Sequence, residues 1–210
     1  MPAFPDRDKP ATFDTDVATP GNLWLAANPG HTGRPPAYWN KKPIKKKLRQ
    51  NFRNLCGYTL MHDMSGTVDH YISWNTDRSK AYDWDNYRFC AGTVNSSKKN
   101  ADDSVFDPWE IEFEWFEIQL PSMIMQVSAS APHHIKDKLE FTLGRLPISD
   151  TDEVIDYRGA FYDEYRRDRT PAVLSIIDRM APVLAASIRA WEAAHPGEDL
   201  PGRPPNATSF

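Results

Sequence analysis

The sequence predicts an α+β fold, with short strands in the middle of the chain and helices on both sides of them. Two short apolar runs meet at Ser65-Gly66, a pattern that is typical of a β-hairpin. Apolar and acidic residues alternate over part of 109–125, which indicates a strand with one solvent-exposed face. Apolar residues recur at helical spacing in 39–55 and in 151–194, so helices are expected to flank these strands.

The composition is that of a globular protein with one domain or two small ones. Of its 210 residues, 40% are hydrophobic and 26% are charged. No apolar run reaches the length of a transmembrane helix, and the first residues lack the pattern of a signal peptide. Two cysteines are too few for a disulfide framework. We therefore expect a cytoplasmic protein that is not bound to a membrane.

Changes in composition divide the chain into four parts. Residues 1–38 are rich in Pro, Gly and Asp and are expected to form an extended arm. The core is expected over 39–110, a strand followed by helices over 111–196, and a disordered tail over 197–210.

The helices are predicted from their faces and their end signals. The first begins near Trp39, with Pro43 in its first turn and Ile44 and Leu48 on its apolar face. Later helices are expected over 132–143, from a capping box at 150–153 to about 167, and after Thr170-Pro171. The last of them should kink at Pro182.

Positive charge is concentrated in the first helix, although the net charge of the chain is −4. Residues 40–53 hold seven of the 25 basic residues and no acid, which leaves the rest of the chain near −11. A basic patch on an acidic body can bind a polyanion locally, although a lysine run is more often a solvated helix face. The candidate nucleic-acid contacts in this segment are Lys41, Lys42, Lys45, Lys46, Lys47 and Arg49.

The middle of the chain carries residue types that suit phosphodiester hydrolysis. His70 is the natural general base, because the unperturbed pKa of histidine lies near neutral pH. Asp69 and Asn95 offer oxygen ligands for one Mg²⁺ or Mn²⁺ ion. Asn86 is placed to position His70, and a short helix is expected to begin near Asn95.

Each of these residues also has a simpler interpretation. An Asp-His pair is commonly a surface hydrogen-bonding unit, Asn86 can be a turn residue, and Asn95 can be a helix cap. Lys98 and Lys99 either contact phosphates or solvate the helix.

Taken together, residues 67–108 resemble the HNH endonuclease family, whose ββα-metal motif is a hairpin, a loop and a short helix around one divalent ion. Asp69-His70 resembles the first-strand pair of the family, and Asn86 resembles its middle Asn. The segment from Cys90 to Lys98 is similar to the C-x-x-C-N-x-x-K end of the motif. The spacings, 16 residues from His70 to Asn86 and nine from there to Asn95, are typical of the family.

The resemblance implies that Asp69 and Asn95 bind the metal, that His70 is the general base, and that the ββα core carries an N-terminal arm, a basic helix and a mainly helical extension. The sequence departs from the family at the cysteines. Many relatives carry two C-x-x-C pairs that hold a structural zinc, whereas only Cys56 and Cys90 remain here. Two thiolates cannot complete a closed tetrahedral site, so no structural Zn²⁺ is expected.

The expected function is therefore metal-dependent cleavage of DNA, and the resemblance suggests phage defence or mobile-element biology as its setting. Two alternatives stay open: a non-catalytic module that binds nucleic acid or assembles complexes on the same scaffold, and an RNA-cutting toxin nuclease. A protein partner for the C-terminal helices is also possible from the resemblance.

Overall fold

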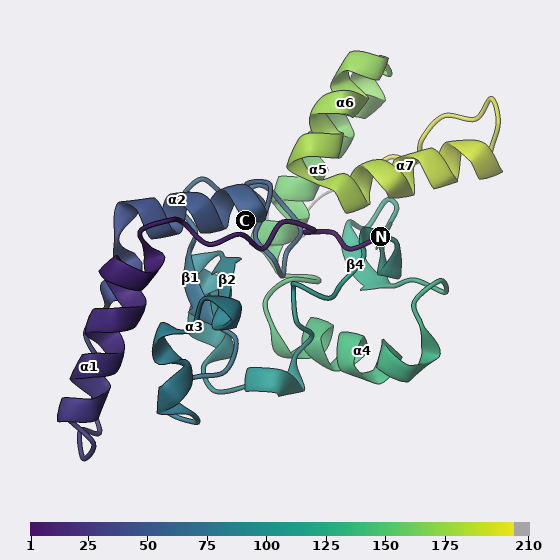
Figure 1. The fold of residues 1–210 in the computed structure, drawn as a ribbon. Helices are drawn as coiled ribbons and strands as arrows, with labels where there is room; N and C mark the ends of the chain where they lie inside the picture. The colour runs from purple at the N-terminus through teal and green to yellow at the C-terminus, as the bar shows by residue number, and fades with distance from the viewer. Residues whose placement is uncertain (204–210) are drawn as a thin grey trace, which may run out of the picture. The chain divides into compact units, whose positions relative to one another are not determined.

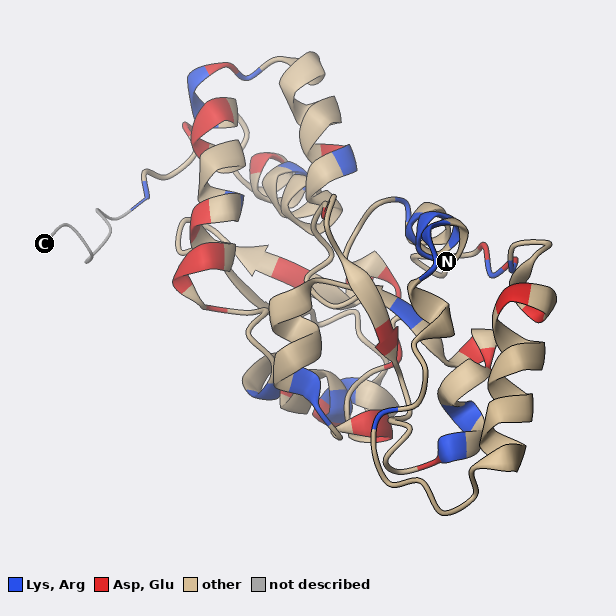
Figure 2. Ribbon diagram, turned by 90° about the vertical axis from the view of Figure 1, so that its left-hand side faces the viewer, with Lys and Arg blue, Asp and Glu red and all other residues tan. Residues whose placement is uncertain are grey.

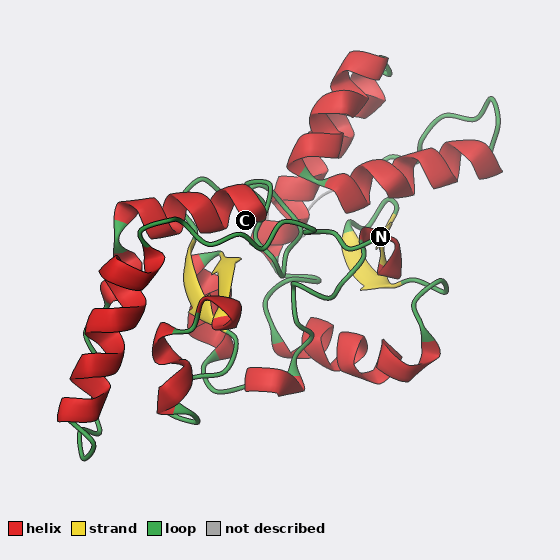
Figure 3. Ribbon diagram, in the orientation of Figure 1, coloured by secondary structure: helices red, strands yellow, loops and turns green. Residues whose placement is uncertain are grey.

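The structure, a computed structural model, describes residues 1–203, which form two compact units. Unit 1 comprises residues 1–58 and 63–111, and unit 2 comprises residues 59–62 and those from 112 onward. Each unit combines helices with a two-stranded antiparallel sheet, so the predicted α+β class is confirmed (Figures 1 and 3).

The N-terminal segment of unit 1 is not the extended arm that was predicted for residues 1–38. A π-helical turn over Asp14–Ala18 leads into helix α1, Thr19–Ala27. Pro20 lies in the first turn of α1, where a proline removes no helical hydrogen bond. The prolines and glycines that suggested a loop are therefore compatible with this helix. Apolar side chains of the segment are buried, among them Phe4, Phe13 and Val17.

Helix α2, Lys42–Asn51, confirms the predicted basic helix, but it is shorter than 39–55. A 3₁₀ turn, Tyr38–Asn40, precedes it. The helix ends because Arg53 and Asn54 take positive φ angles of 55° and 61°, which no right-handed helix contains.

The sheet of unit 1 pairs β1, Thr67–His70, with β2, Tyr87–Cys90. The predicted hairpin around Ser65-Gly66 is wrong, since the strand that pairs with β1 comes after it in the chain. Gly66 serves close packing, because a Cβ there would meet the ring of Phe89 at 2.5 Å. Three further 3₁₀ turns lie in the connections of this unit: Arg78–Tyr82, Trp84–Asn86 and Asp102–Ser104.

Helix α3, Gly92–Lys98, follows β2 directly. Asn95 lies in its middle, so the prediction that the helix begins near Asn95 is wrong. Unit 1 thus places two strands and a short helix in the order β1, β2, α3 (Figure 1).

The sheet of unit 2 pairs β3, Phe116–Gln119, with β4, Ile124–Val127. The prediction of a single strand over 109–125 is therefore wrong. A 3₁₀ turn, Phe113–Trp115, interrupts its first half, and a tight connection folds the second half back into a hairpin.

Four helices complete unit 2: α4 Lys136–Arg145, α5 Asp152–Arg167, α6 Pro171–Met180 and α7 Pro182–Ala194. They confirm the predicted helices, and a 3₁₀ turn, His133–Ile135, precedes α4. The predicted kink at Pro182 is a complete break, because Ala181 leaves the helical conformation. Thr170 caps α6 through Val173 as expected, whereas Thr151 makes no side-chain cap for α5.

The disordered tail predicted for 197–210 is only partly within the described chain. Leu200 is buried, and the Tyr162 hydroxyl donates a hydrogen bond to the Pro201 carbonyl at 2.8 Å. Arg203 pairs with Asp163 at 3.1 Å. Residues 200, 201 and 203 therefore contact α5, contrary to the prediction, and residues 204–210 lie outside the described residues.

Candidate active site

A polar cavity of about 450 Å³ in unit 1 brings several of the predicted site residues together. Asp69 and His70 reach it from the end of β1, and Asn95 reaches it from α3. Residues that the sequence did not predict complete much of its wall: Arg34, Trp39, Ser73, Trp74, Asn75 and Asn100. We call this space the His70 cavity.

The imidazole of His70 is held in one orientation. Its Nε2 lies 2.9 Å from the carbonyl oxygen of Ala81, and its ring packs edge-on against Trp39, Trp74 and Tyr87. A carbonyl oxygen can only accept a hydrogen bond, so Nε2 must carry the proton. In the neutral ring the lone pair then lies on Nδ1.

The surroundings of His70 also keep the ring neutral. The pKa of His70 is lowered from 6.5 to about 4, chiefly by burial; the Ala81 hydrogen bond raises it, and the charges of Lys98 and Arg34 lower it. A neutral imidazole with a lone pair on Nδ1 is the form that can accept a proton from water. Within residues 1–203 no hydrogen bond to Nδ1 is present.

Asp69 is a buried carboxylate with two partners. Its Oδ1 lies 3.3 Å from the ammonium of Lys98, and its Oδ2 accepts a hydrogen bond from the Tyr58 hydroxyl at 3.1 Å. Burial raises the pKa of Asp69, while Lys98 and Tyr58 act in the opposite direction. Each oxygen keeps a second lone pair, so the carboxylate is still a possible metal ligand.

Lys98 does not contact solvent, and its prediction as a nucleic-acid contact is wrong. The side chain has 0% relative exposure. Its ammonium donates hydrogen bonds to the carbonyls of His70 and Tyr71 at 2.9 and 3.0 Å, in addition to its pairing with Asp69. Lys98 therefore ties α3 to the end of β1, since a buried ammonium needs its donors satisfied. Lys99, by contrast, is exposed and lines the His70 cavity.

Asn86 lies outside the cavity wall and acts through the backbone. Its Oδ1 accepts from the amide of Ile72, and its Nδ2 donates to the carbonyls of Ile72 and Lys80. The last contact fixes the turn that presents the Ala81 carbonyl to His70. Asn86 is a positioning residue, not a group that would touch substrate.

Asp69 and Asn95 fit the donor set of a hard divalent ion. The Nδ2 of Asn95 donates a hydrogen bond to the Val68 carbonyl at 3.4 Å, whereas its Oδ1 has no hydrogen-bond partner within residues 1–203. One carboxylate and one amide oxygen beside a polar cavity suit Mg²⁺ or Mn²⁺ with water completing the shell. No cluster of three or more His, Cys, Asp or Glu side chains suited to a metal occurs in the described chain.

The predicted basic contacts of α2 divide into two groups (lysines and arginines are blue in Figure 2). Lys41 pairs with Asp16 at 3.0 Å, and Lys47 lies 3.9 Å from Asp8. The others line a second cavity of about 390 Å³, which we call the lysine groove: Lys42, Lys45, Lys46 and Arg49, beside Met64, Ser65, Gly66 and Phe89. Asn40 lines both this groove and the His70 cavity, so the two are neighbours.

Cys56 and Cys90 are buried and in contact without a disulfide, and Cys90 is the last residue of β2. The amide of Ala91 donates to the Cys56 sulfur at 3.3 Å. Burial raises the pKa of the Cys90 thiol, so the thiolate that a metal would require is disfavoured.

Sequence reasoning missed the aromatic wall of the His70 cavity and the buried ion pair between Arg88 and Asp107. Trp74 stands four residues after His70, but a single tryptophan in a polar loop gives no periodic signal. Arg88 was also missed. Its guanidinium binds Asp107 with two hydrogen bonds of 2.5 Å and anchors β2.

No protein-family model matches this chain, and no curated protein matches it. Within residues 1–203 none of the helices combines the length and apolar character needed to cross a bilayer.

Proposed function

We propose that this protein is a metal-dependent endonuclease of the HNH type that hydrolyses phosphodiester bonds in DNA. The observation that carries the proposal is the His70 imidazole, fixed through Nε2 in one cavity with Asp69 and Asn95. The order β1, β2, α3 around these residues also supports it.

The residues divide the chemistry among them. Nδ1 of His70 takes a proton from the attacking water, and the Ala81 carbonyl stabilises the resulting imidazolium through Nε2. Asp69 and Asn95 would hold the divalent ion, and Lys98 keeps the Asp69 carboxylate in place. When bound there, the ion supplies charge neutralisation for the phosphate and the departing oxygen.

The substrate assignment rests on the cations around the site. Lys99 and Arg34 line the His70 cavity, and the neighbouring lysine groove offers further positive charge. Such contacts bind the phosphate backbone without reading sequence, so DNA cleavage should show weak sequence preference.

One observation favours a second candidate, a non-catalytic module that binds nucleic acid. The Lys98 ammonium already neutralises Asp69 at 3.3 Å, so the carboxylate needs no metal to be stable. The lysine groove would then bind DNA without cleaving it.

A cleavage assay separates the two. Supercoiled plasmid and total RNA are incubated with the protein and Mg²⁺, Mn²⁺ or EDTA, beside His70→Ala. His31→Ala is the matched control, because His31 is exposed in the same unit and lies outside the His70 cavity.

The nuclease proposal predicts metal-dependent nicking that falls by about 10²- to 10⁴-fold in His70→Ala, the range for loss of a general base, and that persists in His31→Ala. Salt-sensitive DNA binding with no cleavage under any condition would reject it in favour of the binding module. Cleavage of RNA alone would reject DNA as the substrate.

A further inference from the structure

We propose that the His70 cavity accepts an unpaired nucleotide, whose base stacks on Trp74 while its phosphates meet Arg34 and Lys99. The inference rests on the proposed function and names its substrate class: single-stranded DNA or unpaired segments within DNA. It stands on the shape, rigidity and charge of the cavity wall.

One wall of the cavity is an aromatic platform. Trp39 and Trp74 are stacked, with ring centroids 5.5 Å apart and an interplanar angle of 26°. Trp39 is 2% exposed and belongs to the core, whereas Trp74 is half-buried and lines the cavity. A half-buried indole backed by a buried one offers apolar surface on which a nucleobase can stack.

The loop that carries Trp74 is held in place. The buried carboxylate of Asp102 accepts from the amide of Ser73 at 2.6 Å and from the Thr76 hydroxyl at 2.5 Å. These two bonds bracket Trp74 in the sequence. A platform that is already ordered loses little conformational entropy when a base stacks on it.

The charges at the cavity suit phosphate groups. The guanidinium of Arg34 lies 5.7 Å from the Trp74 ring centroid and 5.8 Å from that of Trp39. Within the described residues neither Arg34 nor Lys99 has an ion-pair partner. The single carboxylate on the wall, Asp69, is offset by Lys98. A ligand here therefore meets apolar surface and unpaired positive charge together.

The size of the cavity favours one strand. About 450 Å³ falls within the roughly 300–1,000 Å³ of small-ligand pockets, which is room for one nucleotide and not for two paired strands. A base inside a duplex is stacked and paired, so it reaches Trp74 only after unstacking. An unpaired base is presented without that penalty.

The test measures binding of fluorescein-labelled DNA to the full chain in EDTA, so that cleavage plays no part. Three probes share one length: a single strand, its blunt duplex, and the same single strand with abasic residues. Wild type is compared with Trp74→Ala and with Trp74→Phe, which keeps an aromatic face. Trp24→Ala is the matched control, because Trp24 is a half-buried tryptophan of unit 1 beneath Arg78, at 5.9 Å, and outside the cavity.

The expected result is tighter binding of the single strand than of the duplex or the abasic strand. Trp74→Ala should weaken single-strand binding about 5- to 100-fold, the range for loss of one stacked base, and should hardly change abasic binding. Trp74→Phe and Trp24→Ala should stay near wild type.

Equal binding of intact and abasic strands by wild type would overturn the inference without relying on any variant. A uniform loss on all three probes in Trp74→Ala, with Trp24→Ala unaffected, would also overturn it. Cleavage with Mg²⁺ is scored separately. Stacking-dependent binding without cleavage rejects the nuclease alone, and cleavage of duplex without a single-strand preference rejects the stacking alone.

Discussion

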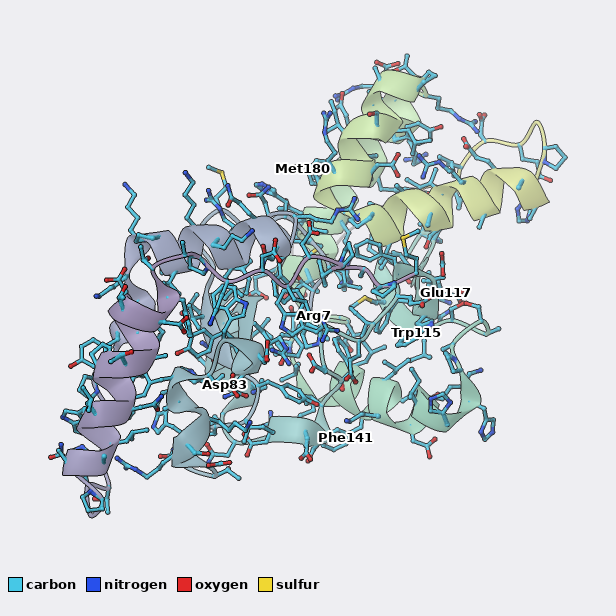
Figure 4. All side chains as sticks on the ribbon, viewed as in Figure 1. Arg7, Asp83, Trp115, Glu117, Phe141 and Met180 are labelled. Carbon is cyan, nitrogen blue, oxygen red and sulfur yellow. The ribbon has the colours of Figure 1, made fainter. Side chains whose placement is uncertain are left out.

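The two antiparallel strand pairs of this protein, β1–β2 and β3–β4, have strands of the same length but differ in the burial of their polar side chains. In β3–β4, buried residues alternate with more exposed ones. Glu117 (labelled in Figure 4) pairs with Gln126 across the strands, and the Nε2 of Gln126 donates a hydrogen bond to Oε1 of Glu117 at 2.5 Å. In β1–β2, nearly every residue is buried, including Asp69 and Arg88.

This difference in burial favours a role beyond folding for the strand pair β1–β2. A charged side chain is rarely buried without a partner, because leaving water is costly. The pairings of Asp69 with Lys98 and of Arg88 with Asp107 supply those partners. An apolar pair of strands would fold with fewer constraints, so the polar groups of β1 are better explained by the chemistry proposed for His70.

Removal of Lys98 should have the largest effect on folding. Lys98→Met leaves Asp69 buried without its cation, and we expect a loss of about 3–5 kcal/mol in the free energy of unfolding. Lys99→Met, at the exposed neighbour, should change it by less than about 0.5 kcal/mol. Urea denaturation of both variants checks this, and equal effects would show that the pairing of Lys98 with Asp69 does not stabilise the fold.

Acid should destabilise the protein through His70. Folding lowers the pKa of His70 from 6.5 to about 4, so the unfolded chain binds a proton first as pH falls. The stabilising contribution is complete above pH 6.5 and is lost towards pH 4, with a total of about 3 kcal/mol.

The raised pKa of Asp69 acts with the opposite sign, so the measurement is the difference between wild type and His70→Gln across the same pH series. Parallel pH profiles for the two proteins would show that His70 titrates in the fold as it does in the unfolded chain.

The lysines of the lysine groove should contribute more to DNA affinity than Lys41 and Lys47, the lysines at α2 that pair with acids. Lys45→Ala with Lys46→Ala removes two groove cations, and each lost phosphate contact should reduce the slope of log affinity against log salt by about 0.7–0.9. Lys41→Ala with Lys47→Ala should reduce it less, because these lysines already pair with acids. A salt titration of DNA binding compares the two, and identical slopes would argue against the groove.

The smallest effect is expected in the second hairpin. Glu117→Gln keeps the shape of a side chain that is only partly buried, and the free energy of unfolding should change by less than about 0.5 kcal/mol. Thermal unfolding measures it. A loss as large as that of Lys98→Met would mean that polar groups in the two sheets do not differ in the way described.

Sequence reasoning predicted the elements whose signal is local. Helix α2 follows from the spacing of Ile44 and Leu48, and α6 follows from Thr170 and Pro171. It failed where distant residues decide the outcome. Gly66 resembled a turn residue, yet it makes room for Phe89, and Lys98 resembled a surface cation, yet it is enclosed by β1.

The site was also predicted only in part, because local sequence signals identified some of its residues and the tertiary fold brings in the others. Asp69, His70 and Asn95 were recognisable from their order and spacing, and they do line one cavity. Arg34 and Trp74 join them only through the tertiary fold, from segments with no pattern of their own.

The proposed role of His70 is tested first by NMR of protein with ¹⁵N-labelled histidine across pH 3–8, which measures the protonation of the ring, with His70→Gln to assign the signal. We expect a neutral ring protonated on Nε2 down to about pH 4, with the lone pair on Nδ1. A neutral ring protonated on Nδ1 would contradict the assignment of Nδ1 as the proton acceptor, and a pKa near 6.5 would contradict the effect of burial on the ring.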